Sequence, residues 1–256
     1  IIVFNAVLRS PLSWTTISLP IVTLALSCII CAFFYLLGRY LWRDSRKNAL
    51  GFIAGEANTG YFGLPVAILL RGWVDEGIYQ TGVGTKSTAD FLANNGFITL
   101  APDFLGYGSS DDASQDILLS RFNKPIEIIS LFTSLETLEK AESQKVVFWA
   151  HSNGGQIALS VLEITGRKIP TSLWAPVSTP FPESILYFAS EMPDGGKKLN
   201  EIIDAFKTKY HAEDFSVKSY LDKISSPIIL HQGQKDEAVP PAWSEDLARE
   251  LKKLNK

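Results

Sequence analysis

One serine stands between small residues in FWAHSNGGQIALS, residues 148 to 160, where a strand pattern gives way to a helix pattern. Ala150, Ser152 and Gly154 fit a nucleophile elbow, with alanine in place of the usual first glycine. Small residues are needed there because the serine occupies a sharp, strained turn between strand and helix. We predict that Ser152 is a nucleophile and that the backbone N–H of Asn153 faces a developing oxyanion.

A serine nucleophile of this kind works with an acid and a second oxyanion donor. The acid is expected after the next-to-last strand, where HQGQKDEAVPP supplies Asp236, with Glu237 as the weaker alternative. The second donor is expected in the loop after an early strand. In AILLRGWVDEGIY, Arg71 and Gly72 end such a strand, so the N–H of Trp73 is our second oxyanion donor.

The base that activates the serine is harder to place. The chain has three histidines, and none of them follows Asp236, although the chain order in this arrangement is serine, acid, histidine. His151 is expected to point into the packing of the elbow, His231 ends a core strand, and His211 lies in a segment between elements. We therefore expect structural roles for all three, a base beyond residue 256, and an incomplete, inactive triad in this piece.

Short apolar runs alternate with longer amphipathic ones from about residue 64 onward, which is typical of a parallel α/β sheet with helices on both faces. Strands are predicted at 65–70, 96–101, 145–150, 171–175 and 227–232, and helices at 87–95, 125–141, 154–165 and 244–254. The segment 184–222 breaks this rhythm. We expect it to form a small cap over the carboxyl edge of the sheet.

The composition excludes some classes of function. The formal net charge is −3 and the basic residues are spread along most of the chain, so no basic face indicates a nucleic-acid partner. Cys28 and Cys31 lie inside an apolar run, so we interpret them as packing residues and not as a disulfide or a zinc site. No metal or organic cofactor is implied, and no oligomeric state follows from the sequence.

Residues 1–63 differ from the rest. The 21 positions from 17 to 37 carry no charge, and predict a transmembrane helix. Four basic residues follow within 38–48, which predicts that this loop is cytoplasmic and that the protein is membrane-associated. A second apolar stretch, 49–70, contains Glu56 and Asn58 between glycines. We place the domain boundary between residues 63 and 64, with the side of the membrane that holds the second domain left open.

The motif EANTGYFGLP, with the apolar helix and basic loop before it, resembles the auxin efflux carrier family over about 60 residues. The resemblance implies that Asn58, Gly63 and Pro65 belong to an interrupted helix near a transport site. A plain membrane anchor is the alternative for this segment.

Residues 64–256 resemble the α/β-hydrolase superfamily, nearest its prolyl-oligopeptidase-like and dienelactone-hydrolase-like members, through RGWVDEGIYQTGVGT, GFITLAPDFLGYGSSD, FWAHSNGGQIAL and HQGQKDEAVPP. The resemblance implies serine hydrolysis of an ester or peptide through an acyl-enzyme, with Asp236 orienting the histidine. Asp103 is implied to be structural. The chain departs from the pattern at Ala150 and at Arg71, where a histidine often precedes the oxyanion glycine.

Three hypotheses follow. The first is a serine hydrolase acting on a small acyl or peptide substrate, tethered to a membrane or artificially fused to the first segment. The second is a fragment of a carrier-like membrane transporter fused to a hydrolase domain. The third is a non-catalytic protein with the hydrolase fold. The choice between ester and peptide does not follow from the sequence, because the shape of the pocket sets specificity.

Overall fold

The computed structural model describes residues 64–138 and 140–254, together with Ile29, Ala32, Phe33, Leu36 and Tyr40. The chain divides into two compact units, Ile1–Phe62 and Gly63–Lys256. Apart from those five exposed helical residues, the predicted transmembrane segment 17–37, both cysteines, the basic loop 38–48 and the carrier motif up to residue 63 lie outside the described part. Their assignments remain predictions. Across the described residues, no helix is both long enough and apolar enough to span a bilayer.

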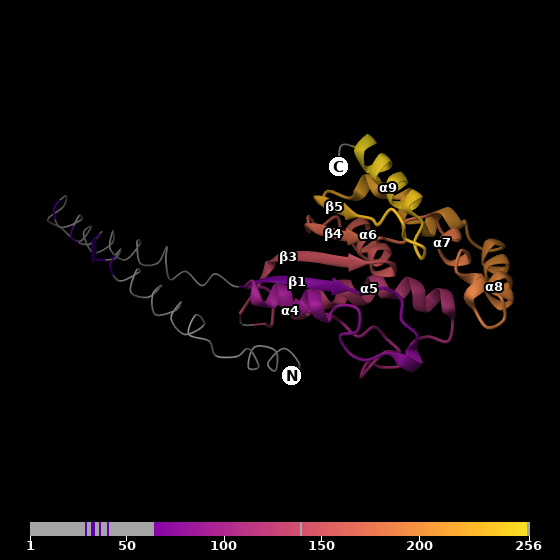
Figure 1. Cartoon of the computed structure of the whole chain (residues 1–256), viewed down its shortest axis with the longest axis horizontal. Coiled ribbons are helices and arrows are strands. Elements are labelled where there is room, and N and C mark those ends of the chain that lie inside the picture. Colours follow the sequence, from indigo (N-terminus) through magenta and orange to yellow (C-terminus); the bar gives the residue numbers. More distant parts are fainter. Residues whose placement is uncertain are drawn as a thin grey trace. The chain divides into compact units, whose positions relative to one another are not determined.

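Five parallel strands form one sheet in the order β2-β1-β3-β4-β5 (Figure 1). All five expected strands are present, and their bounds are β1 Leu64–Leu70, β2 Ile98–Leu100, β3 Ala141–His151, β4 Thr171–Trp174 and β5 Ile228–His231. The chain passes from β1 to β2 on one side, then returns to place β3 on the other side of β1. The order of the strands therefore reverses between β1 and β3.

Strand β1 lies at the centre of this reversal. Its run from Val66 to Leu70 is at most 1% exposed, so both of its faces are covered, as expected for a buried parallel strand. Pro65 occupies its second position, where a missing N–H disturbs the ladder least. The carrier interpretation of Pro65 is therefore wrong, because this residue lies in a strand and not in an interrupted helix.

The helices of the second unit are α4 Lys86–Asn94, α5 Ile117–Leu135, α6 Asn153–Thr165, α7 Glu183–Leu186, α8 Lys197–Lys207 and α9 Pro241–Lys253. Short 3-10 turns occupy Glu76–Ile78 (η1), Ala189–Glu191 (η2), Ala212–Phe215 (η3), Val217–Ser219 (η4) and Leu221–Lys223 (η5).

Helix α5 begins eight residues before the sequence analysis placed its start. Asp116 caps it, since its carboxylate accepts hydrogen bonds from the N–H groups of Leu118 and Leu119 at 2.9 and 3.0 Å. Pro125 lies buried inside the helix. Proline usually occupies the first helical position, so the predicted helix starts at Pro125 and misses the true cap.

The main core lies on one face of the sheet, where side chains of β1, β3 and β4 pack with α5, α6 and α9. On the opposite face, β1 is covered, but Trp174 of β4 and Ile229 of β5 remain 42% and 63% exposed. Both faces of β1 are therefore covered, as the expectation of helices on both faces requires. At Trp174 of β4 and Ile229 of β5, one face of the described sheet is open.

The segment between β4 and β5 builds a second, smaller core. Phe181, Leu199 and Ile203 are buried there, and they pack with Leu118 and Phe122 of α5. Figure 1 shows α7 and α8 beyond the arrowheads of β1 and β3, which is the carboxyl edge of the sheet. The segment thus lies where the sequence analysis expected a cap.

Candidate active site

The turn between β3 and α6 is strained at its serine. Ser152 has φ 53° and ψ −119°, and in the described chain only Ala175 shares a positive φ among non-glycine residues. Three backbone hydrogen bonds hold this turn. The Ser152 N–H donates to the carbonyl of Trp174 at 2.9 Å, and the Ser152 carbonyl accepts from Gly155 and Val177 at 2.9 and 3.0 Å. The surrounding structure therefore enforces a conformation that a serine rarely adopts.

The small residues of the predicted elbow are small for steric reasons. A Cβ on Gly154 would lie 2.1 Å from the carbonyl oxygen of Leu70, and a Cβ on Gly155 would lie 2.5 Å from the Cβ of Pro176. Ala150 is fully buried in β3. The absence of a side chain at position 154 lets the elbow approach the end of β1, and its absence at position 155 lets it approach the segment after β4.

Ser152 lies at the point where the strand order reverses. In open α/β sheets the crevice for ligands lies outside the carboxyl ends of the strands at such a point. The loop after β1 reaches it as well, because a Cβ on Gly72 would be 3.2 Å from the Cβ of Ser152. The structure thus brings together the two segments that the sequence analysis singled out, the elbow and the Arg71 to Trp73 loop.

The peptide between Gly72 and Trp73 has a fixed direction. Arg71 donates from Nη1 to the carbonyl oxygen of Gly72 at 3.0 Å. In a trans peptide the N–H points opposite to the carbonyl, so the Trp73 N–H is directed away from the arginine. Asn153 is the first residue of α6, where a backbone N–H has no partner within its own helix.

Asp236 lies in the loop after β5 and is held in place by three donors. Its Oδ1 accepts from the N–H groups of Ala238 and Val239 at 3.0 and 2.9 Å, and its Oδ2 accepts from Nε2 of Gln232 at 3.1 Å. Glu237, the weaker alternative, is exposed, and no described contact fixes its carboxylate. The geometry favours Asp236 as the oriented acid of this loop.

The three histidines occupy different surroundings. His231 stacks on Trp174 with ring centroids 4.1 Å apart, and His211 is exposed between α8 and η3. His151 was expected to pack inside the elbow, and this is wrong. Because side chains alternate along a strand, Ala150 enters the core and His151 turns to the opposite face, where it is exposed. Partial burial still lowers the pKa of His151, and the charge of Asp236 opposes that shift.

Asp103 fixes the loop that follows β2. It accepts hydrogen bonds from the hydroxyls of Tyr79 and Thr81, the latter at 2.9 Å. Burial raises the pKa of Tyr79, and the carboxylate of Asp103 raises it further. Asp103 therefore ties together two loops, in line with the structural role that the hydrolase resemblance implied.

Two basic residues of α5 were missed in the sequence, and one of them, Arg121, contacts the elbow. Arg121 donates from Nη1 to Oδ1 of Asn153 at 3.5 Å and from Nη2 to Oγ of Ser184 at 3.2 Å. Burial lowers the pKa of Arg121 to about 10. It also lowers the pKa of Lys124 to about 8, with help from Arg121 and Arg71. Their spacing of three in RFNK was the available signal, but it required α5 to begin before Pro125.

No profile of a known protein family matches this sequence. One curated relative, the uncharacterized peptidase YtmA of Bacillus subtilis, is 26% identical over 215 residues, which is 80% of this chain and 76% of that protein. Among solved structures, an esterase of Pyrococcus furiosus superposes with a TM-score of 0.56 at 17% identity, covering 76% of this chain and 71% of the esterase. The acylaminoacyl peptidase of Pyrococcus horikoshii gives a TM-score of 0.56 at 15% identity.

The second unit therefore has the α/β-hydrolase fold that its motifs predicted. The match covers 77% of this chain but only 32% of the acylaminoacyl peptidase, and 27% of a dipeptidyl aminopeptidase IV homologue from Bacteroides ovatus. The chain thus spans about a third or less of these two peptidases. None of the relatives named here supports the carrier resemblance of the first unit.

Proposed function

We propose that this protein is a serine hydrolase that cleaves an ester or a peptide bond through an acyl-enzyme on Ser152. The observation that carries the proposal is the strained serine at the reversal of the strand order, with φ 53° and the loop of Gly72 beside it. The esterase and peptidase names of the relatives support the same class of reaction. Strained backbone conformations cluster at active sites, which favours a catalytic role for Ser152 over the non-catalytic alternative.

In the proposed reaction, Ser152 Oγ attacks the carbonyl carbon of the substrate while a histidine oriented by Asp236 accepts its proton. The carbonyl oxygen becomes an oxyanion, which the N–H groups of Asn153 and Trp73 stabilise. The bond to the leaving alcohol or amine then breaks, and that group takes the proton from the histidine. Water repeats the sequence on the acyl-serine, which releases the acid and restores Ser152.

Substitution of Ser152 in the full natural chain tests this proposal. We would measure hydrolysis of p-nitrophenyl butyrate and of an acyl-peptide p-nitroanilide for Ser152→Ala and for Ser160→Ala. Ser160 lies on α6 and bonds Gln156 at 3.0 Å, so it is a matched control on the same helix. Loss of at least ~10³-fold in kcat/KM for Ser152→Ala alone is expected. An unchanged rate in Ser152→Ala would overturn the proposal.

A further inference from the structure

Three cations act on one another's charge, and two of them, Arg121 and Arg71, adjoin the elbow that carries the proposed nucleophile. Arg71, Arg121 and Lys124 form no ion pair with any described carboxylate, although ion pairs do form elsewhere on the domain. Withdrawing cations from water without a partner is unfavourable by several kcal/mol. Such a group is expected to be completed by an anion from outside the chain.

Arg71 supplies an independent sign of a missing partner. It is 6% exposed, and its Nε and Nη2 atoms are buried with no hydrogen-bond acceptor in the described chain. Its guanidinium lies 4.5 Å from the ring centroid of Tyr79 and 4.2 Å from that of Tyr107. These rings attract the cation, and the positive charge of Arg71 in turn opposes the rise in the pKa of both tyrosines that burial causes.

Lys124 approaches two rings of the aromatic group that Arg71 also contacts. Its Nζ is 5.8 Å from the ring centroids of both Tyr107 and Phe104. Arg121 and Lys124 are three residues apart on α5, so they share one face of that helix. The charges of Glu127 and Glu76 act on Lys124 without forming an ion pair with it, and Glu127 is engaged with the N–H of Leu105 at 3.0 Å.

Two of these three cations, Arg121 and Arg71, lie next to the elbow of Ser152. Arg121 bonds Asn153, the residue after the nucleophile, and Ser184 of α7 in the segment over the sheet edge. Arg71 begins the loop whose Gly72 approaches Ser152. An anion held by these side chains would therefore belong to a molecule that also reaches Ser152.

We propose that Arg121 and Lys124, backed by Arg71, form a subsite for a carboxylate carried by the substrate of Ser152, so that the protein prefers acyl compounds with an anionic end. The inference rests on the proposed function, because it places the anion on a molecule that Ser152 attacks. A monoanion suits the site better than a phosphate dianion, since Glu127 and Glu76 already offset part of the positive charge.

Binding to a Ser152→Ala background of the full natural chain tests the subsite without any turnover. Titrations followed by ligand NMR would compare monomethyl glutarate, which is anionic, with methyl butyrate, which is neutral. We expect at least about tenfold tighter binding of the anionic ester, as for a charge-assisted hydrogen bond. Arg121→Gln and Lys124→Met should each reduce this preference severalfold. Equal affinities, or a preference unchanged in both variants, would overturn the subsite.

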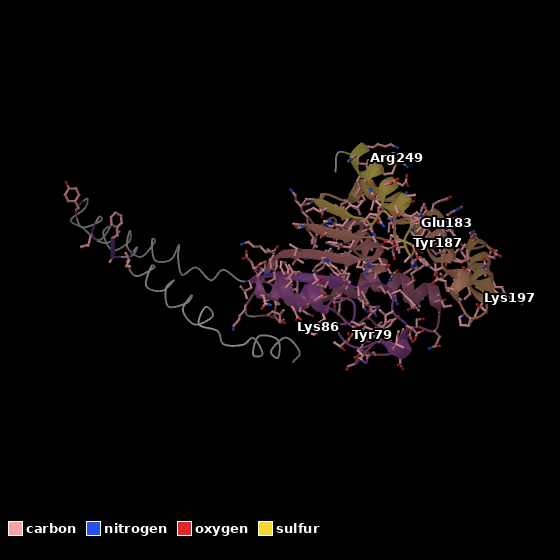
Figure 2. The ribbon with its side chains drawn as sticks, viewed as in Figure 1. Tyr79, Lys86, Glu183, Tyr187, Lys197 and Arg249 are labelled. Atoms are coloured by element: carbon pink, nitrogen blue, oxygen red, sulfur yellow. The ribbon has the colours of Figure 1, made fainter. Side chains whose placement is uncertain are left out.

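Controls separate the other outcomes. Arg249→Gln removes a surface arginine of α9, on the opposite side of the domain from Tyr79 in Figure 2, and should keep the preference. Circular dichroism checks folding, and Lys124→Met decides the matter if Arg121→Gln does not fold. Inorganic phosphate and glutarate would each be tested as competitors of monomethyl glutarate. Stronger displacement by phosphate would overturn the choice of a carboxylate. If Ser152 of the unsubstituted protein is unreactive while the anion preference persists, the proposed function is refuted, and the cations bind an anion that is not a substrate of Ser152.

Discussion

Gly154 faces the carbonyl oxygen of Leu70 so closely that a Cβ at position 154 would lie 2.1 Å from it. This approach joins the first turn of α6 to the end of β1. It fixes the elbow against the loop that carries Gly72 and Trp73, so the nucleophile and one proposed oxyanion donor share a single rigid corner.

Gly154→Ala should therefore destabilise the domain strongly. The oxygen it meets is backbone and cannot rotate away, so we expect a loss of about 3 kcal/mol or more in the free energy of unfolding. Thermal denaturation measures the effect. Gly233→Ala is the matched control, because its Cβ would meet its nearest neighbour at 3.8 Å. Equal stability of the two variants would show that α6 and β1 are not packed in this way.

Asp236→Asn should abolish most activity while the protein remains folded. The amide keeps the shape of the side chain but no longer orients a protonated histidine, and the expected loss in kcat is about 10³- to 10⁴-fold. Glu237→Gln serves as the control on the neighbouring, exposed carboxylate. If Glu237→Gln lost the activity and Asp236→Asn kept it, the acid would be assigned to the wrong residue.

Two substitutions separate the backbone N–H of Trp73 from its side chain. Trp73→Pro eliminates the N–H and should reduce kcat about 10²- to 10³-fold. Trp73→Ala keeps the N–H and deletes a side chain that is 68% exposed, so a change of less than about threefold is expected. Circular dichroism verifies that both variants fold. Similar kinetics for the two variants would contradict the role of this N–H.

Because of Glu163, the free energy of unfolding should fall as the pH rises. Burial, and secondarily Asp222, raise its pKa from 4.5 to about 9, and its Oε1 has no partner in the described chain. As the pH rises, Glu163 loses its proton in the unfolded chain before it does so in the folded one. The contribution of the raised pKa to the free energy of unfolding is therefore complete below about pH 4.5 and declines as the pH rises toward 9.

Glu163→Gln should raise the free energy of unfolding at pH 8 by about 1 to 3 kcal/mol and flatten its dependence on pH. Denaturant titrations at pH 5 and pH 8 measure both effects. Glu201→Gln, at an exposed position of α8, should change neither. A Glu163→Gln variant with the parent's pH profile would show that the glutamate is ionised in the folded protein.

Much of the fold was predictable because it rests on local patterns. The apolar run of β1 and the small residues around Ser152 predict a strand, a tight turn and a helix by themselves. The position of Asp236 followed from chain order. Element boundaries near proline were less predictable, as Pro125 shows, because a cap nine residues earlier overrides the preference of proline for the first helical position.

The missed features depend on contacts that are distant in sequence. Arg121 reaches Asn153 and Ser184 across 32 and 63 residues, and no periodicity within α5 encodes that. The exposed position of His151 follows from how the far face of β3 is covered, which alternation alone does not determine. Such features emerge only once the strands and the segment over their edge are in place.

The proposed function requires Ser152 to be an activated nucleophile. Treatment of the full natural chain with a fluorophosphonate, followed by peptide mass spectrometry, tests this directly. One adduct is expected, on Ser152, and it should be absent from Ser152→Ala and retained in Ser160→Ala. No adduct on the folded protein, or an adduct on another serine that persists in Ser152→Ala, would contradict it.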